Sequence, residues 1–241
     1  TAQDLKGGIV TYQQTIKYNF EAVFDPNGDA VARIKTFLST LPKEETKTKI
    51  LYFTDKTSLY EEDKSAIEAP VPGVQRALAR AAGVKPPTVE IEKVYSDFGN
   101  NEVTQQVLFM TRNFVVSGPT EKKAWKFTNK MIKVLDYTCM SAEFMDGDTT
   151  YTAWFTSEIP VSTGPELYSG LPGLILAIEM NGETAIIATS IDLNPPEEGV
   201  ISIPDNGDKV KQEEFDKIVK DKIDEWAKNR GSVRRGRGGG R

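Results

Sequence analysis

The sequence predicts an α+β protein that is mainly antiparallel β, built on a curved sheet or half-barrel with a few packed helices. Segments of alternating apolar and polar residues, or of β-branched and aromatic residues, recur at short intervals along most of the chain. Turn-forming residues separate these segments, and helical spacing of apolar residues occurs at only a few places. We therefore expect a single β-rich domain over residues 1–229, followed by a disordered Arg/Gly tail over 230–241.

The first part of the chain predicts strands interrupted by helical segments. Residues 9–18 alternate apolar and polar side chains, as in an amphipathic strand, whereas residues 30–41 space their apolar side chains by three and four, as in a helix. Residues 49–54 and 58–61 flank a turn and are typical of a hairpin. Residues 69–87 form an insertion-like loop in which an alanine-rich stretch predicts a short helix.

The middle of the chain predicts a run of strands. Residues 89–116 favour strands by their alternation and by their β-branched and aromatic content. Further short strands follow, with turn signals between them, at residues 124–127, 131–135, 137–144, 149–155, 174–179 and 184–193. This spacing is typical of an antiparallel sheet that is either open or curled into a partial barrel.

The end of the predicted domain carries one helix, over residues 209–228. Asp208 can cap the start of this helix. Apolar side chains recur along it at helical spacing, at Phe215, Val219, Ile223 and Trp226. We expect that apolar face to dock on the sheet.

Charge is distributed unevenly along the chain. The 241 residues carry a net charge of −5, yet five arginines lie in the last twelve residues, so the rest of the chain is near −10. An acidic body argues against a nucleic-acid-binding surface on the fold, and we expect no nucleic-acid partner. In the tail, Arg234, Arg235 and Arg237 are candidate partner-binding residues that could contact anionic lipid or an acidic protein surface. A passive, solvated end is the alternative interpretation.

The residues needed for common catalytic and metal sites are scarce. The chain has no histidine and a single cysteine, Cys139, so the usual nucleophile–base pairs and zinc ligand sets cannot be assembled. We interpret Cys139 as a small apolar side chain of the core. Acidic residues between 143 and 166 are explained better by solvated turns than by a paired-carboxylate site. The sequence therefore predicts a protein that is not an enzyme, with no catalytic residue, cofactor or metal site.

Two features bear on location. The longest apolar run, at residues 171–178, contains a proline and a glycine and is far shorter than the roughly 20 residues of a membrane-spanning helix, so we expect no transmembrane segment. The sequence does not begin with methionine, and we interpret it as the mature chain of an exported protein whose signal peptide has been removed.

The densest pattern lies between residues 125 and 193 and includes Gly170-Leu171-Pro172-Gly173-Leu174-Ile175. Ordered matches stand upstream of this hexapeptide, at residues 137–139, Ala142, 151–156, 158–160 and 164–165. Together these residues resemble the GLPGLI family of exported Bacteroidota envelope proteins, with weaker likeness at 58–61 and in the first strand. The resemblance implies a periplasmic or outer-membrane-associated location and a place in an outer-membrane transport or assembly complex. It also implies a half-barrel similar to periplasmic lipoprotein carriers.

The residues of this region admit a structural and a binding interpretation. Gly170, Pro172 and Gly173 can form a tight turn that leads into an apolar strand, so we interpret the hexapeptide as architecture, with a partner-binding loop as the alternative. The aromatic residues nearby are candidates for partner binding, although core packing competes for most of them. These candidates are Tyr151, Trp154, Phe155 and Tyr168. We expect a non-enzymatic binding or scaffold subunit, or alternatively a carrier that shelters a lipid or other apolar ligand.

Overall fold

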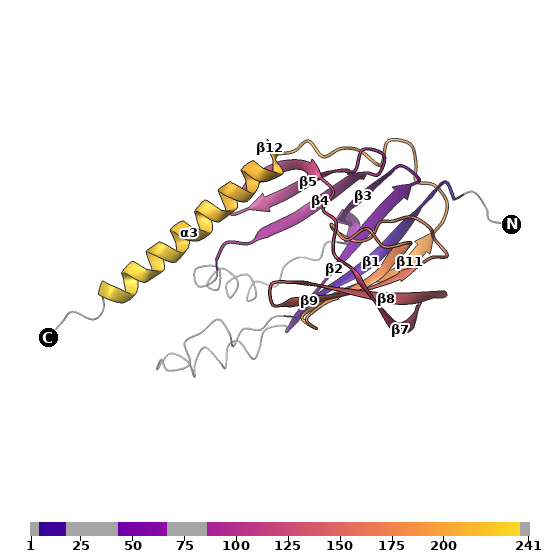
Figure 1. Ribbon diagram of the computed structural model, residues 1–241. Coiled ribbons are helices and arrows are strands. Elements are labelled where there is room, and N and C mark those ends of the chain that lie inside the picture. The colour runs from indigo at the N-terminus through magenta and orange to yellow at the C-terminus, as the bar shows by residue number, and fades with distance from the viewer. Residues whose placement is uncertain (1–4, 18–42, 67–85, 237–241) are drawn as a thin grey trace.

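The computed structural model describes residues 5–17, 43–66 and 86–236, and these form one large open sheet with a single α-helix (Figure 1). The sheet has twelve strands in the order β12-β6-β5-β4-β3-β2-β1-β11-β10-β9-β8-β7. Every neighbouring pair is antiparallel except β12 and β6. The predicted predominance of antiparallel strands is therefore confirmed. Among the described helices, none combines the length and apolar character needed to cross a bilayer.

The first half of the sheet is a meander of consecutive strands. Its strands are β1 (Gly7–Lys17), β2 (Glu44–Thr54), β3 (Thr57–Glu62), β4 (Val89–Asp97), β5 (Glu102–Phe109) and β6 (Arg112–Pro119). A short 3-10 turn, η2 (Lys64–Ala66), follows β3. The hairpin predicted around residues 55–57 is confirmed as β2–β3, whereas the helices predicted at 30–41 and within 69–87 lie outside the described residues.

The second half is another meander, which joins the first along β1. Its strands are β7 (Lys126–Val134), β8 (Tyr137–Asp146), β9 (Thr149–Thr156), β10 (Leu174–Met180) and β11 (Thr184–Asp192). The two strands predicted at 124–127 and 131–135 are one strand, β7, because its pairing with β8 continues across an irregularity between Phe127 and Met131. Strand β11 lies antiparallel to β1, so the first strand of the chain is in the middle of the sheet.

The C-terminal helix, α3 (Gln212–Gly236), differs at both ends from the helix predicted at 209–228. Asp208 does not cap it, because Asp208–Lys211 forms β12 in parallel pairing with Phe114–Ser117 of β6. The helix continues through Gly236, so residues 230–236 do not belong to a disordered tail. Residues 237–241 lie outside the described part of the chain. The helix begins later than the local spacing predicts because residues 208–211 pair with a strand about a hundred residues away.

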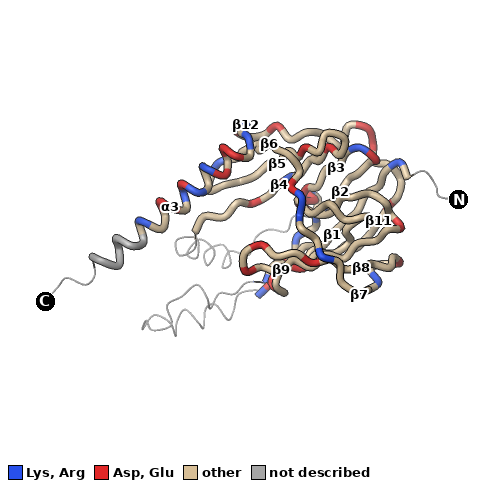
Figure 2. The backbone as a smooth tube through the Cα atoms, in the orientation of Figure 1, with Lys and Arg blue, Asp and Glu red and all other residues tan. Residues whose placement is uncertain are grey.

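Two clusters of buried side chains hold the fold together. The larger one packs Ile159, Val161 and Leu171, from the connection between β9 and β10, against residues of the sheet. The smaller one places Phe215 of α3 against β5 and β6, with ring centroids 6.2 Å from Phe109 and 5.2 Å from Phe114. The predicted docking of this helix is therefore confirmed at its first turns, and Figure 1 shows the rest of α3 extending away from the sheet. Acidic and basic residues alternate along it (Figure 2).

Candidate functional site

The hexapeptide at residues 170–175 forms a tight turn and then enters β10. Gly170 and Gly173 have φ angles of 89° and 150°, which side chains rarely adopt. A Cβ atom on Gly173 would lie 2.0 Å from the carbonyl oxygen of Thr156, so the close approach of the two backbones requires glycine. Leu174 and Ile175 are fully buried. The prediction that this turn leads into a buried strand is confirmed.

The connection at residues 157–173 lies against the beginning of β10. The amide of Leu174 donates to the carbonyl of Ile159 at 3.0 Å, and the amide of Ile175 donates to the carbonyl of Thr163 at 3.0 Å. The hydroxyls of Thr163 and Ser58 are buried 3.3 Å apart. Backbone and side-chain contacts thus fix this connection on the sheet.

A hydrogen bond from β1 reaches the same region. The Tyr12 hydroxyl donates to the carbonyl of Ile175 at 2.7 Å in a fully buried environment. Ile175 borders an irregularity in the pairing of β10 with β9, where the regular ladder is interrupted. Burial raises the pKa of Tyr12 far above its usual range, so this hydroxyl remains a hydrogen-bond donor at all physiological pH values.

Aromatic side chains form a second layer around the turn. The rings of Phe144 and Tyr151 stack with centroids 4.6 Å apart and an interplanar angle of 6°. Tyr168 lies 5.8 Å from Tyr151, and Trp125 meets the Phe144 ring edge-on at 4.7 Å. The Trp125 indole donates to the carbonyl of Ser169 at 2.8 Å. The cluster therefore connects the residue before β7, the strands β8 and β9, and the hexapeptide turn.

A group of buried polar side chains lies between β1, β2, β3 and residue 166. Lys49, which is only 5% exposed, forms an ion pair with Glu62 at 2.7 Å. Gln14 donates to Glu166 at 3.1 Å, and Glu166 has a left-handed backbone with φ of 50°. Burial raises the pKa of the Glu166 carboxyl, while the Lys49 charge and the Gln14 hydrogen bond partly offset that effect. The Tyr60 hydroxyl is buried here without a hydrogen-bond partner among the described residues.

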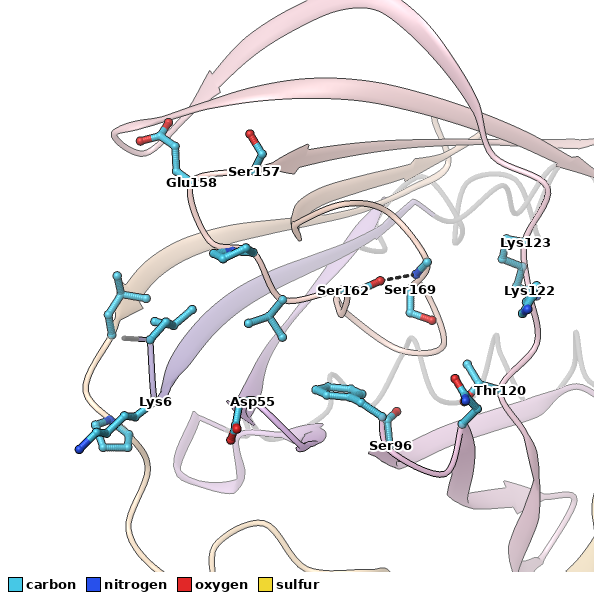
Figure 3. Close-up of a pocket in the computed structure, with 18 of the residues that line it drawn as sticks. Lys6, Asp55, Ser96, Thr120, Lys122, Lys123, Ser157, Glu158, Ser162 and Ser169 are labelled. Atoms are coloured by element: carbon cyan, nitrogen blue, oxygen red, sulfur yellow. Dashed lines mark hydrogen bonds between the residues drawn. The ribbon is translucent and has the colours of Figure 1, made fainter. Parts of the chain in front are cut away.

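A wide groove of about 1730 Å³ opens where several strands end and their connections begin (Figure 3). Lys6 stands on one side of it, and Lys122 and Lys123 stand on the other, on the connection between β6 and β7. Hydroxyl groups project between them from Ser96, Thr120, Ser157, Ser162 and Ser169. The groove is thus lined by basic, acidic and hydroxyl side chains together with several apolar side chains.

Three of the charged residues that line this groove form contacts with neighbouring residues. Lys123 forms an ion pair with Glu121 at 2.5 Å and lies 5.7 Å from the centre of the Phe144 ring. Glu158 accepts a hydrogen bond from the amide of Thr138 at 3.3 Å. These contacts are of a structural kind and bring none of the three residues into a paired acid–base arrangement across the groove.

Cys139 is fully buried in β8. Burial raises the pKa of its thiol to about 11, so the reactive thiolate is scarce at neutral pH. The interpretation of this residue as part of the core is confirmed.

The predicted partner-binding residues divide between the core and the helix. Phe155 is fully buried, and Tyr151, Trp154 and Tyr168 are partly buried against the main core, so packing accounts for most of their surface. Arg234 and Arg235 lie within α3 rather than in a disordered tail, and Arg237 lies outside the described residues. The structure brings the aromatic candidates together with the hexapeptide, but it does not place them on an open surface.

The sequence interpretation missed an apolar surface at the β7–β8 hairpin. Of the eleven large apolar residues that are exposed in the described part of the chain, six lie in β7, in β8 or in the turn between them. They are Phe127, Met131, Ile132, Leu135, Met140 and Met145, with exposed fractions from 38% to 71%. The sequence feature that indicates this surface is the irregular apolar spacing of β7, which predicts two short strands instead of one. We call these six residues the hairpin surface.

One family model matches part of the chain, at residues 143–177. Its description is "Protein of unknown function (Porph_ging)". The matched segment runs from β8 to β10 and contains the hexapeptide turn. No curated protein sequence matches the chain.

The fold resembles two solved structures of PNGF-II, in space groups P21 and C2. Each superposes with a TM-score of 0.55 over 89% of this chain, at sequence identities of 18% and 17%. The chain spans about a third of the length of PNGF-II, at 33% and 32%. At this level of identity, the likeness concerns the fold alone. The described chain is therefore a mostly β protein with an open, mainly antiparallel sheet of the kind found in part of PNGF-II.

Proposed function

We propose that this chain is a non-enzymatic binding or scaffold subunit that docks a partner protein through the hairpin surface. The single observation that carries the proposal is the concentration of exposed apolar side chains on β7 and β8, while the other exposed apolar residues of the described chain are scattered. Exposed apolar side chains that are concentrated in one hairpin, such as the cross-strand neighbours Met131 and Met140, are typical of sites of protein association. The aromatic cluster behind the hairpin supplies a rigid support, because Trp125, Phe144 and Tyr151 pack against one another.

The proposed location is the cell envelope, in an outer-membrane transport or assembly complex. This part of the proposal rests on the resemblance of residues 137–175 to the GLPGLI family, and the partial match to the Porph_ging model over residues 143–177 is compatible with it. The half-barrel shape similar to lipoprotein carriers belongs to the same proposal, and the open order of the sheet is compatible with it.

Site-specific crosslinking in native envelopes tests the proposal. In the test variant, a photoreactive amino acid replaces Met131, which is 63% exposed on β7. In the matched control, it replaces Met110, which is 58% exposed in the turn between β5 and β6. We expect one specific protein to crosslink at position 131 but not at 110, and the crosslink to disappear when Met140→Ser, opposite position 131 in the hairpin, is added. Equal crosslinking at both positions, or none at either, would contradict the proposal.

The alternative function is a carrier for a lipid or another apolar ligand. One observation weighs against it: Ile159, Val161 and Leu171 pack against the sheet with exposed fractions of 9% or less, so the chain's own side chains fill that space. An apolar ligand would have to displace the connection at residues 157–173. Native mass spectrometry of protein purified from envelopes tests this alternative, which predicts a bound lipid at a stoichiometry of one.

A further inference from the structure

Strand β7 lies at one end of the sheet, and its only neighbouring strand in the described chain is β8. The backbone N–H and C=O groups on its other side therefore face away from the sheet. An edge strand of this kind is a template for pairing with another strand. The opposite end of the sheet is formed by the four-residue strand β12, which leads directly into α3 and offers a much shorter edge.

The side chains of β7 determine which kinds of side chain a strand that pairs with it should have. Phe127, Met131 and Ile132 are exposed apolar side chains on β7. The strand contains Lys126, Lys130 and Lys133 but no acidic residue, in a chain whose net charge is negative. Lys130 is paired with Glu143 of β8 at 3.2 Å, whereas no ion pair involves Lys126 or Lys133 among the described residues. The edge is thus both apolar and locally basic.

We propose that β7 accepts, by strand addition, an extended segment of another polypeptide that carries acidic and apolar side chains. This inference rests on the proposed function and gives its partner a chemistry. Added strands gain affinity from main-chain hydrogen bonds and specificity from side-chain contacts. Opposite charges across neighbouring strands stabilise the pairing, and like charges destabilise it. Acidic side chains on the incoming strand therefore complement Lys133, while Lys126 adds to the local positive charge.

A second copy of this chain is a poorer occupant of the same edge. Pairing of β7 with β7 of another copy would bring two lysine-rich strands together without a compensating acidic residue on either. The irregularity between Phe127 and Met131 also divides the edge, so the regular part available for pairing is the short stretch Met131, Ile132, Lys133 and Val134. A short, separate peptide segment fits this stretch better than a second copy of the whole strand.

Synthetic peptides test the inference directly. One nine-residue peptide alternates valine with glutamate, and a second peptide alternates valine with lysine. Both peptides are fluorescently labelled, and their binding to the full chain is measured by fluorescence anisotropy. We expect the glutamate peptide to bind and the lysine peptide to bind at least tenfold more weakly. We also expect the glutamate peptide to protect from hydrogen exchange the amides among residues 131–134 that face away from β8, because strand addition supplies them with hydrogen-bond partners.

Matched variants separate the edge from nonspecific charge and apolar effects. The double variant Lys126→Glu/Lys133→Glu and the single variant Met131→Ser should each weaken binding of the glutamate peptide at least tenfold. The controls Lys217→Glu/Lys220→Glu, on α3, and Met110→Ser should leave binding within twofold. Circular dichroism verifies that every variant is folded.

Four outcomes would overturn the inference. Equal binding of both peptides would remove the acidic specificity, and absence of binding would leave the lysines and the irregularity as protection against aggregation only. A dimer that forms through β7 would identify a second copy as the occupant. Crosslinking at position 131 without protection of the amides at 131–134 would refute strand addition but leave the proposed function intact, whereas failure of the crosslinking removes the proposed function itself.

Discussion

The Tyr12 hydroxyl donates a hydrogen bond to the carbonyl oxygen of Ile175, 2.7 Å away and separated from it by 163 residues of chain. Tyr12 belongs to β1 and Ile175 to β10, and β11 lies between these strands. This bond therefore crosses the junction of the two meanders. It also satisfies a backbone carbonyl beside the irregularity in β10, where a ladder partner is missing on one side.

The substitution Tyr12→Phe tests the value of this bond. It removes the donor while keeping the ring, so we expect the free energy of unfolding to fall by about 1–3 kcal/mol, the usual cost of leaving a buried carbonyl unsatisfied. Urea denaturation measures the change. Tyr52→Phe is the matched control, because Tyr52 is only half-buried and should shift stability by less than about 0.5 kcal/mol. Equal effects of the two substitutions would show that the bond contributes nothing specific.

The two glycines of the hexapeptide should respond differently to alanine. Gly170 has room for a Cβ atom, since its nearest neighbour in Trp125 is 3.9 Å away, so Gly170→Ala should cost only the backbone strain of about 1–2 kcal/mol. At Gly173 the Cβ atom would meet the Thr156 carbonyl oxygen at 2.0 Å, and we expect a loss of roughly 4 kcal/mol or complete unfolding. Thermal denaturation compares them. Similar melting temperatures for the two variants would contradict the close approach at Gly173.

Glu166 should make stability depend on pH. Its pKa is raised by burial, so the folded state holds the carboxyl proton more tightly than the unfolded state does. Its favourable contribution is therefore present below the usual glutamate range and is lost as pH rises through the raised pKa. We expect Glu166→Gln to be more stable than the wild-type chain at pH 7, and the difference to shrink towards pH 4. Urea denaturation at both pH values measures it.

Glu225 provides a control of opposite sign for this pH dependence. It is exposed, and a hydrogen bond from Lys222 lowers its pKa, so its small contribution is present above the usual range and is lost as pH falls. Glu225→Gln should not be more stable than the wild-type chain at pH 7. If Glu166→Gln proved less stable than the wild-type chain at pH 7, attraction to Lys49 would outweigh the effect of burial.

Cys139 should be unreactive in the folded chain. With its pKa raised to about 11 and its side chain buried, we expect alkylation by iodoacetamide at pH 8 to be roughly 100-fold slower than in urea. Mass spectrometry follows the labelling. Thr138→Cys in a Cys139→Ala background places an exposed thiol one residue away and should react rapidly. Rapid labelling of the folded wild-type chain would show that β8 opens locally.

The sequence was sufficient for features that depend on local chemistry. The glycines at 170 and 173 and the apolar run after them predicted a turn and a buried strand, and both are present. Period-two alternation likewise located β1, and helical spacing located the apolar face of α3 around Phe215. In each case the preference of a short segment agrees with its final environment.

Features that depend on distant partners were not predicted. Gln14 and Lys49 occupy core-facing positions of their strands, where polar side chains are unexpected, and Glu166 and Glu62 pair with them there. The local sequence predicts Asp208 as a helix cap, whereas Asp208 begins a strand that pairs with β6. The hairpin surface was missed for the same reason, because only the place of β7 at the end of the sheet leaves its side chains exposed.

The order of the strands also has a consequence for biosynthesis. The six strands made first, β1 to β6, are flanked on both sides by strands made later, with β11 beside β1 and β12 beside β6. As the chain leaves the ribosome, the border at β1 stays uncovered until β11 has been made, and the border at β6 stays uncovered until β12 has been made. Two unpaired strand edges are therefore present on the nascent chain throughout the synthesis of β7 to β10, and a chaperone that binds exposed strands would act in that interval.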